Sequence, residues 1–105
     1  MTNDETSQPG LVYLLWAVGT DRFKIGYTAR AVGQRAWAIE AASPYPLKIL
    51  ASMPGRVRDE KDLQHDFRQH RSHREWFILA EDAVYALLSR FGMNSDYIYA
   101  AAMLA

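Results

Sequence analysis

The chain of 105 residues lacks cysteine and has no long hydrophobic run. Without cysteine it can form neither a disulfide nor a thiolate metal site, so zinc ribbons and redox-active thiol motifs are excluded. The longest apolar run covers residues 11–18, far short of the ~20 residues that span a bilayer, and no basic segment precedes it as in a signal peptide. We therefore expect a soluble, cytoplasmic protein that does not enter a membrane.

An excess of one charge is also missing, because 12 Lys and Arg residues balance 12 Asp and Glu residues. No field of the whole molecule attracts nucleic acid, so a site for a polyanion has to come from local clustering of basic side chains. Half of the positions are apolar, which is enough for the core of one domain.

The chain divides into three parts. Residues 1–10 are polar and end in Pro9-Gly10, so we expect a flexible leader. The main domain is expected over residues 11–92. The last segment, residues 93–105, is apolar with Asn94 or Ser95 as a cap, and we expect a helical extension there.

The pattern of the main domain is that of an α+β fold. Apolar runs bounded by turn residues predict strands over residues 11–18, 22–27 and 47–53, with a short extended segment over 75–79. Amphipathic spacing with capping and stop residues predicts helices over residues 29–42, 56–70, 81–91 and 94–104. This order favours a small antiparallel sheet flanked by helices.

Two ionic side chains fall on apolar helix faces. Arg35 lies three residues after Val32 and four before Ile39, and Glu60 lies midway between two apolar positions of its own helix. Burying an unpaired charge costs several kcal/mol, so each needs a partner, a cleft or a metal ion. Spacing alone does not separate a partly buried Arg35–Glu60 ion pair from a functional cleft.

The first two predicted strands add a phenol and an ammonium group. Their alternation allows Tyr13 and Lys24 to be cross-strand neighbours. Together with Arg35 and Glu60 they would form a phosphate site. For Tyr13 the alternative is a half-buried core aromatic.

Several short motifs in this order are similar to those of a known family. They are Gly10-Leu11-Val12-Tyr13, Lys24-Ile25-Gly26-Tyr27-Thr28, Arg35, Glu60 with Leu63 and Phe67, and Glu75-Trp76-Phe77. Over about residues 10 to 90 the chain resembles the GIY-YIG nuclease superfamily, in particular its bacterial and phage branch with a Lys-Ile-Gly second motif. The resemblance implies a three-stranded antiparallel sheet flanked by helices, and hydrolysis of phosphodiester bonds in DNA with one divalent metal ion.

The resemblance also implies a role for each matching residue. Tyr13 would act on the attacking water, Arg35 would stabilise charge on the phosphate, and Glu60 would hold Mg²⁺ or Mn²⁺. We further hypothesise that Lys24 lowers the pKa of Tyr13 and makes it a better base. Relatives in this branch carry a His four residues after the glutamate, where this chain has Gln64.

Substrate contacts are predicted outside this group as well. The candidates are Tyr27, Arg30, Arg71 and Arg74. The basic residues around the second helix are either a surface that follows the phosphate backbone or a solvated face, because acidic residues lie between them. Trp76 and Phe77 are expected in the core and Trp37 at the surface.

We therefore predict a small metal-dependent DNA endonuclease with Tyr13, Lys24, Arg35 and Glu60 as catalytic residues, Glu60 as the metal ligand and DNA as the partner. A second copy of the chain or a targeting protein is left open as a further partner. The alternative is a catalytically inactive DNA-binding or protein-interaction module with the same fold.

Overall fold

The computed structural model describes residues 9–29 and 32–92. Its strands are β1 (Gly10–Ala17), β2 (Arg22–Thr28), β3 (Leu47–Gly55), β4 (Arg71–His73) and β5 (Trp76–Ile78). Its helices are α1 (Val32–Glu40), α2 (Val57–Asp66) and α3 (Glu81–Arg90), with a 3₁₀ turn at Arg68–His70. The strands form one antiparallel sheet in the order β3-β1-β2-β5-β4.

The α+β prediction is confirmed, but the described residues contain five strands and not three. The segment expected to be extended at residues 75–79 contains β5, which pairs with β2 from Arg22 to Lys24. β4 lies beyond it at the edge of the sheet. Strands of three residues are too short to show alternation in the sequence, so their existence depends on pairing partners.

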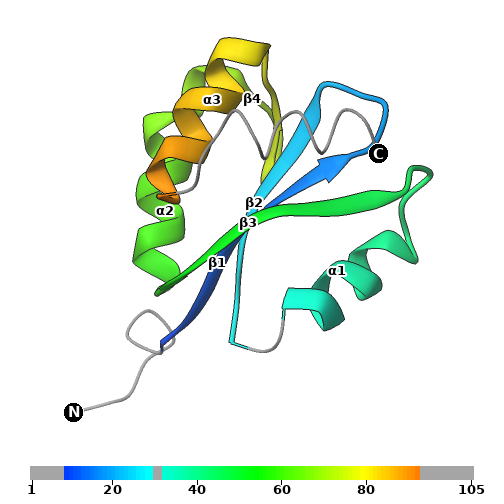
Figure 1. The fold of residues 1–105 in the computed structure, drawn as a ribbon, viewed down its shortest axis with the longest axis horizontal. Helices are drawn as coiled ribbons and strands as arrows, with labels where there is room; N and C mark the ends of the chain where they lie inside the picture. Colours follow the sequence, from blue (N-terminus) through cyan, green and yellow to red (C-terminus); the bar gives the residue numbers. More distant parts are fainter. Residues whose placement is uncertain (1–8, 30–31, 93–105) are drawn as a thin grey trace.

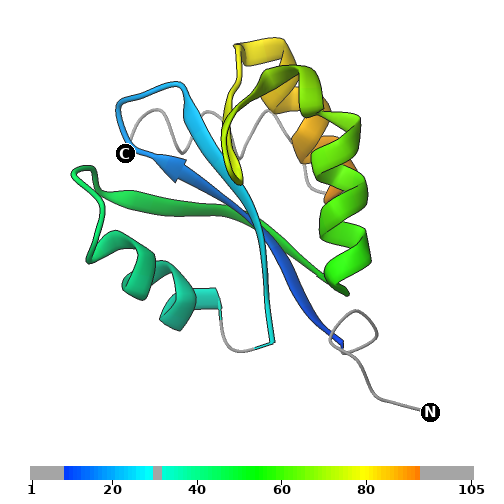
Figure 2. The ribbon, with the colours of Figure 1, turned by 180° about the vertical axis from the view of Figure 1, so that it is seen from behind.

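Helices cover both faces of the sheet (Figure 1), with α1 on one face and α2 and α3 on the other; Figure 2 shows the same arrangement from behind. Alternation along β1 divides its side chains between the faces. Val12, Leu14 and Trp16 join the main core with residues of α2 and α3. Tyr13 and Leu15 belong to the thinner layer under α1.

α2 lies along the part of β2 that β5 leaves open. The pairing of β5 with β2 ends at Lys24, and the side-chain nitrogen of Gln64 donates to the carbonyl oxygen of Ile25 at 2.9 Å. A buried backbone carbonyl without a partner is costly, so this bond attaches α2 to the edge of the sheet. Glu60, one turn earlier on α2, is thereby held near the face that α1 covers.

Element ends differ slightly from the expected ranges. The helix expected over residues 56–70 is α2 followed by the 3₁₀ turn, and β1 begins at Gly10, within the expected leader. The rest of that leader and the helix expected over residues 94–104 lie outside the described residues. None of the described helices is long and apolar enough to cross a membrane.

Candidate active site

A pocket of about 350 Å³ opens on the α1 side of the sheet. We call it the charged pocket, and it is lined by Tyr13, Lys24, Tyr27, Arg35, Ile39, Glu60 and Glu75. Strands β1 and β2, helices α1 and α2 and the turn between β4 and β5 all contribute to it. The four residues predicted to be catalytic therefore share one pocket, and their chemical roles remain predictions.

The side chain of Tyr13 passes over a glycine of β2 to enter this pocket. Its partner on β2 is Gly26, and a Cβ atom on Gly26 would overlap the ring and hydroxyl oxygen of Tyr13. Lys24 is directly opposite Leu15, so it lies diagonally across the two strands from Tyr13 on the same face of the sheet. The expectation that Tyr13 and Lys24 are cross-strand neighbours is confirmed in this diagonal form.

Burial raises the pKa of Tyr13 to about 12; Arg35 opposes the rise, and Glu75 and Glu60 add to it. The hypothesis that Lys24 lowers this pKa is wrong. The Lys24 ammonium donates to a carboxylate oxygen of Glu75 at 2.5 Å, so its charge is matched within the protein. Tyr13 is therefore a protonated phenol at neutral pH.

Glu60 is a buried carboxylate, 4% exposed, on the inner face of α2. Burial, with a smaller contribution from Glu75, raises its pKa to about 7 against the opposing charges of Lys61, Lys24 and Arg35. Among the described residues its carboxylate has neither a hydrogen bond nor an ion pair. Every fully buried polar side-chain atom among the described residues has a hydrogen-bonding partner. The unpaired oxygens of Glu60 are therefore not fully buried, and they face the pocket.

Arg35 lies at the rim of the pocket and is exposed, not directed at the core as expected. The reason is that Ala36 and Ile39 make the contacts of α1 with the sheet layer. The alternative of an Arg35–Glu60 ion pair is also wrong, because neither residue forms an ion pair with another described residue. A free guanidinium and a free carboxylate thus face the same pocket.

Glu75 is a residue of the pocket that was not predicted as a site residue and appeared in the sequence only as part of a motif. Glu75 lies directly before β5 and enters the pocket because β5 pairs with β2, next to Lys24. In the sequence Glu75 is only a carboxylate beside a short apolar segment. This pattern does not indicate which strand the segment pairs with, so it does not place Glu75 in the pocket.

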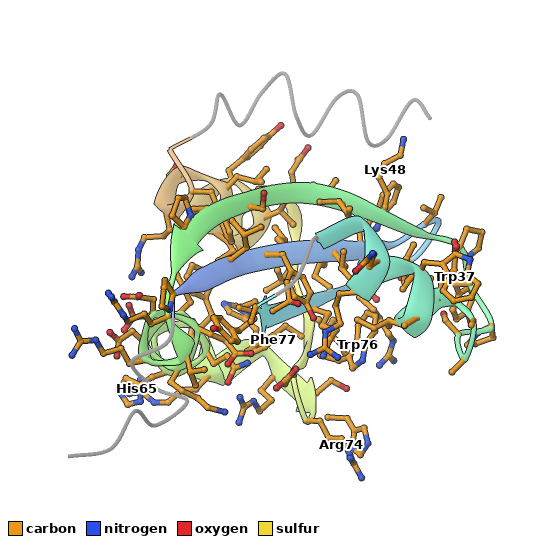
Figure 3. The ribbon with its side chains drawn as sticks, turned by 90° about the horizontal axis from the view of Figure 1, so that it is seen from below. Trp37, Lys48, His65, Arg74, Trp76 and Phe77 are labelled. Atoms are coloured by element: carbon orange, nitrogen blue, oxygen red, sulfur yellow. The ribbon has the colours of Figure 1, made fainter. Side chains whose placement is uncertain are left out.

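The candidates for substrate contacts are distributed differently. Tyr27 lines the charged pocket, with its ring over Gly10, where a Cβ would lie 2.7 Å from a ring carbon. Arg71 instead donates to the side-chain oxygen of Gln64 at 3.1 Å. Arg74 is exposed in the β4–β5 turn at φ 56° and projects away from the sheet in Figure 3. Arg30 lies outside the described residues.

A second hollow of about 300 Å³ lies along the outer side of α2. We call it the cationic groove, and it is lined by Lys61, Gln64, His65, Arg68 and Arg71. It is close to the charged pocket, since Lys61 follows Glu60 in the chain and lowers its pKa. The two hollows place basic side chains beside a site that holds a free carboxylate.

Comparison with known families assigns residues 10–92 to the T5orf172 domain. The chain belongs to the T5orf172 domain family. This match overturns the resemblance to the GIY-YIG superfamily, which is a different family. The short motifs that suggested it contain Gly10 and Gly26, and both glycines have a local packing reason: each lies under a tyrosine ring.

The match of the T5orf172 domain extends from the start of β1 to just beyond α3, and it includes every residue of the charged pocket. Comparison with curated proteins and with solved structures found no significant match. The family match therefore gives the extent of the domain, and the chemistry of the domain depends on the residues of the site.

The carboxylates in the charged pocket of this T5orf172 domain fit a divalent cation that is bound by few protein ligands. Glu60 offers free carboxylate oxygens, and Glu75 lines the same pocket. Nowhere in residues 9–29 and 32–92 do three or more His, Asp or Glu side chains gather as metal ligands. A cation held here would keep most of its ligands as water, which suits Mg²⁺.

Proposed function

We propose that this domain is a metal-dependent endonuclease that hydrolyses phosphodiester bonds in DNA. The observation that supports the proposal is the meeting of three groups in the charged pocket: the hydroxyl of Tyr13, and the guanidinium of Arg35 and the carboxylate of Glu60, which have no bonded partner among the described residues. Phosphodiester hydrolysis needs positive charge on the phosphate oxygens and a held water molecule. This set of groups can provide both.

Arg35 is the group that binds the phosphate. A guanidinium presents several donors in a plane and binds phosphate oxygens through two parallel hydrogen bonds. Because Arg35 is exposed and makes no bond to another described residue, it can turn to a substrate without breaking an internal contact. Negative charge on the phosphate grows as the bond breaks, so a fixed cation there lowers the barrier.

Glu60 is the ligand for the cation. Burial makes its ionised form unfavourable, and a cation in the pocket would reverse that preference. When bound, a divalent ion would supply further positive charge at the phosphate and make a water molecule more acidic. The ionised form of Glu60 is needed for this role, so low pH weakens it.

Tyr13 and Lys24 take positioning roles. With its pKa near 12, Tyr13 keeps its proton at neutral pH and can hold a water molecule or a phosphate oxygen by hydrogen bonds. Lys24 holds Glu75 at the pocket through their ion pair. Neither role requires Lys24 to activate Tyr13.

The cationic groove favours a polymer over a small phosphate compound. Two of its basic side chains, Lys61 and His65, lie on α2, the helix that carries Glu60, and Arg68 and Arg71 follow in the 3₁₀ turn and in β4. Contacts of this kind bind the phosphates that flank a cleaved bond and do not depend on sequence.

The test is cleavage of supercoiled plasmid and of branched DNA in Mg²⁺ or Mn²⁺. We expect Glu60→Gln and Arg35→Met to lose activity by about 100-fold or more, because each removes charge that acts in the transition state. Asp62→Asn, which changes an exposed acid on the same helix, is the matched control and keeps full activity.

Two outcomes would contradict the proposal. Equal cleavage by the wild type and Glu60→Gln would show a contaminating nuclease. Salt-sensitive DNA binding without cleavage in any divalent metal would indicate the non-catalytic binding module instead.

A further inference from the structure

A second pocket on the same face, of about 380 Å³, has a different chemistry. We call it the apolar pocket. Its walls are mainly apolar, and they include Ala17, Arg22, Ile39, Pro44, Tyr45 and Trp76. The proposed hydrolysis does not use any of their polar groups. The apolar pocket therefore has no role in the proposed hydrolysis.

The apolar pocket adjoins the charged pocket. Ile39 lines both of them. Across the sheet, Lys24 in the charged pocket is the register partner of Trp76 in the apolar pocket, and paired strands lie about 4.8 Å apart. A group bound in one pocket is thus within one nucleotide's reach of the other.

The walls of the apolar pocket suit a flat aromatic ring. Trp76 is half-buried, not a core residue as expected, and Tyr45 remains 48% exposed beside Pro44. The Arg22 guanidinium lies at the same pocket, and its one side-chain hydrogen bond to another described residue goes to the Ser72 hydroxyl at 3.2 Å. Aromatic faces with one arginine are the means by which proteins hold single bases.

We propose that the apolar pocket binds the base of a nucleotide next to the phosphate held by Arg35, stacked on Trp76 and Tyr45. This proposal rests on the proposed function, because the phosphate in the charged pocket defines where the base lies. A sugar-phosphate group does not suit these walls, whereas a base has two apolar faces and a polar edge that can meet Arg22.

Binding of a base in the apolar pocket restricts which DNA substrates fit the domain. In a regular duplex the base is stacked and paired, so it reaches the pocket only after leaving the stack. The domain therefore selects DNA in which that base is already unpaired, such as a single strand, a flap or a branch point. The selection depends on DNA structure, with little dependence on which base is present.

Binding in EDTA tests the inference without cleavage. The probes are fluorescein-labelled decathymidylate and a decamer of abasic residues with the same phosphates. Stacking of a base on an aromatic side chain is worth roughly 5- to 150-fold in affinity. We expect wild-type protein to prefer the thymidylate probe by a factor in this range.

Two variants test whether the preference for the thymidylate probe comes from the apolar pocket. Tyr45→Ala, in an exposed loop, and Trp76→Leu should both move the ratio of the two dissociation constants toward one. Trp37→Ala is the matched control, because Trp37 is 73% exposed on α1 and lines neither pocket. It should leave the ratio unchanged. Circular dichroism confirms that each variant is folded.

The outcomes separate the two proposals. If the wild type binds both probes equally, or if Tyr45→Ala keeps the full preference, the base pocket is overturned even where Mg²⁺-dependent cleavage is present. If the preference depends on Tyr45 but no metal supports cleavage, the base pocket stands and the endonuclease proposal fails.

Discussion

At the scale of single residues, Glu60 shows a conflict between folding and function. Its carboxylate is buried on α2 without a hydrogen-bonding partner among the described residues, and its pKa rises from 4.5 to about 7. A shift of this size corresponds to roughly 3 kcal/mol. Folding alone would favour a neutral side chain here, which is consistent with a carboxylate kept for binding a cation.

Glu60→Gln should therefore stabilise the metal-free protein at high pH. Below about pH 4.5 the Glu60 carboxyl is protonated in both the folded and the unfolded chain, and its stabilising contribution is complete. As pH rises through about 7 the folded carboxyl also ionises and that contribution is lost. We expect the variant to exceed the wild type by about 2–3 kcal/mol at pH 8 and to match it at pH 4.

Urea unfolding in EDTA at both pH values measures this difference. Asp62→Asn, exposed on the same helix, should change stability by less than about 0.5 kcal/mol at either pH. A Glu60→Gln protein that is less stable than the wild type at pH 8 would show that the carboxylate makes a stabilising contact.

Gly26 shows how one missing side chain positions another. The ring of Tyr13 occupies the space in which a Cβ would lie, so Gly26→Ala must displace the ring or separate the strands. We expect a loss of about 1–3 kcal/mol in stability, together with loss of cleavage. Gly33→Ala is the matched control: nothing lies within 4 Å of its Cβ position on α1, and alanine favours a helix by up to about 1 kcal/mol.

Thermal unfolding of the two glycine variants provides the comparison. If Gly26→Ala unfolds at the same temperature as the wild type and cleaves DNA normally, the Tyr13 ring does not need its present position.

At the scale of elements, the placement of α2 depends on Gln64. Its side chain donates to the Ile25 carbonyl of β2 and accepts a hydrogen bond from Arg71, whose guanidinium also lies 5.4 Å from the centre of the Phe77 ring. These contacts link α2 to β2, β4 and β5. The position at which related sequences were expected to carry a His thus has a structural use here, outside the charged pocket.

Gln64→Ala should loosen α2 and with it Glu60. The substitution leaves the buried Ile25 carbonyl without its side-chain donor, which costs about 1–3 kcal/mol. We expect a matching loss in urea unfolding and a several-fold higher Mg²⁺ concentration for half-maximal cleavage. Gln69→Ala, at an exposed position of the 3₁₀ turn, should change neither quantity. An unchanged Mg²⁺ requirement in Gln64→Ala would show that α2 is held in place by other contacts.

At the scale of the whole molecule, a net charge of zero hides an uneven distribution. The cationic groove gathers Lys61, His65, Arg68 and Arg71 beside the charged pocket. Figure 3 places His65 of this groove and Lys48 of β3 on opposite sides of the molecule. DNA binding should then depend on the groove and not on the total charge.

The salt dependence of DNA binding checks this distribution. Each lost phosphate contact reduces the slope of log K against log salt by about 0.9, so Lys61→Gln with Arg68→Gln should reduce it by roughly 1.5–2. Lys48→Gln should leave the slope unchanged. An equal effect of both changes would mean that DNA responds only to total charge.

Much of the fold could be predicted because its signals are local. Apolar runs bounded by turn residues predicted β1 and β2 at residues 11–18 and 22–27, and the apolar stripes with their stop residues predicted α1, α2 and α3 within a few residues. The same periodicity placed Glu60 on the inner face of its helix. β4 was missed, and the family suggested by the short motifs was wrong.

The sequence by itself determined that Glu60 and Leu63 lie on the inner face of α2, because that depends on a period of 3.6 residues along the chain. Only the tertiary structure decided that Glu75 joins Lys24, 51 positions away, that Arg35 and Glu60 remain apart in a shared pocket, and that Trp76 lines a pocket of its own. These facts depend on which strands pair and in what register, and contacts between distant segments follow from the packing of the whole chain.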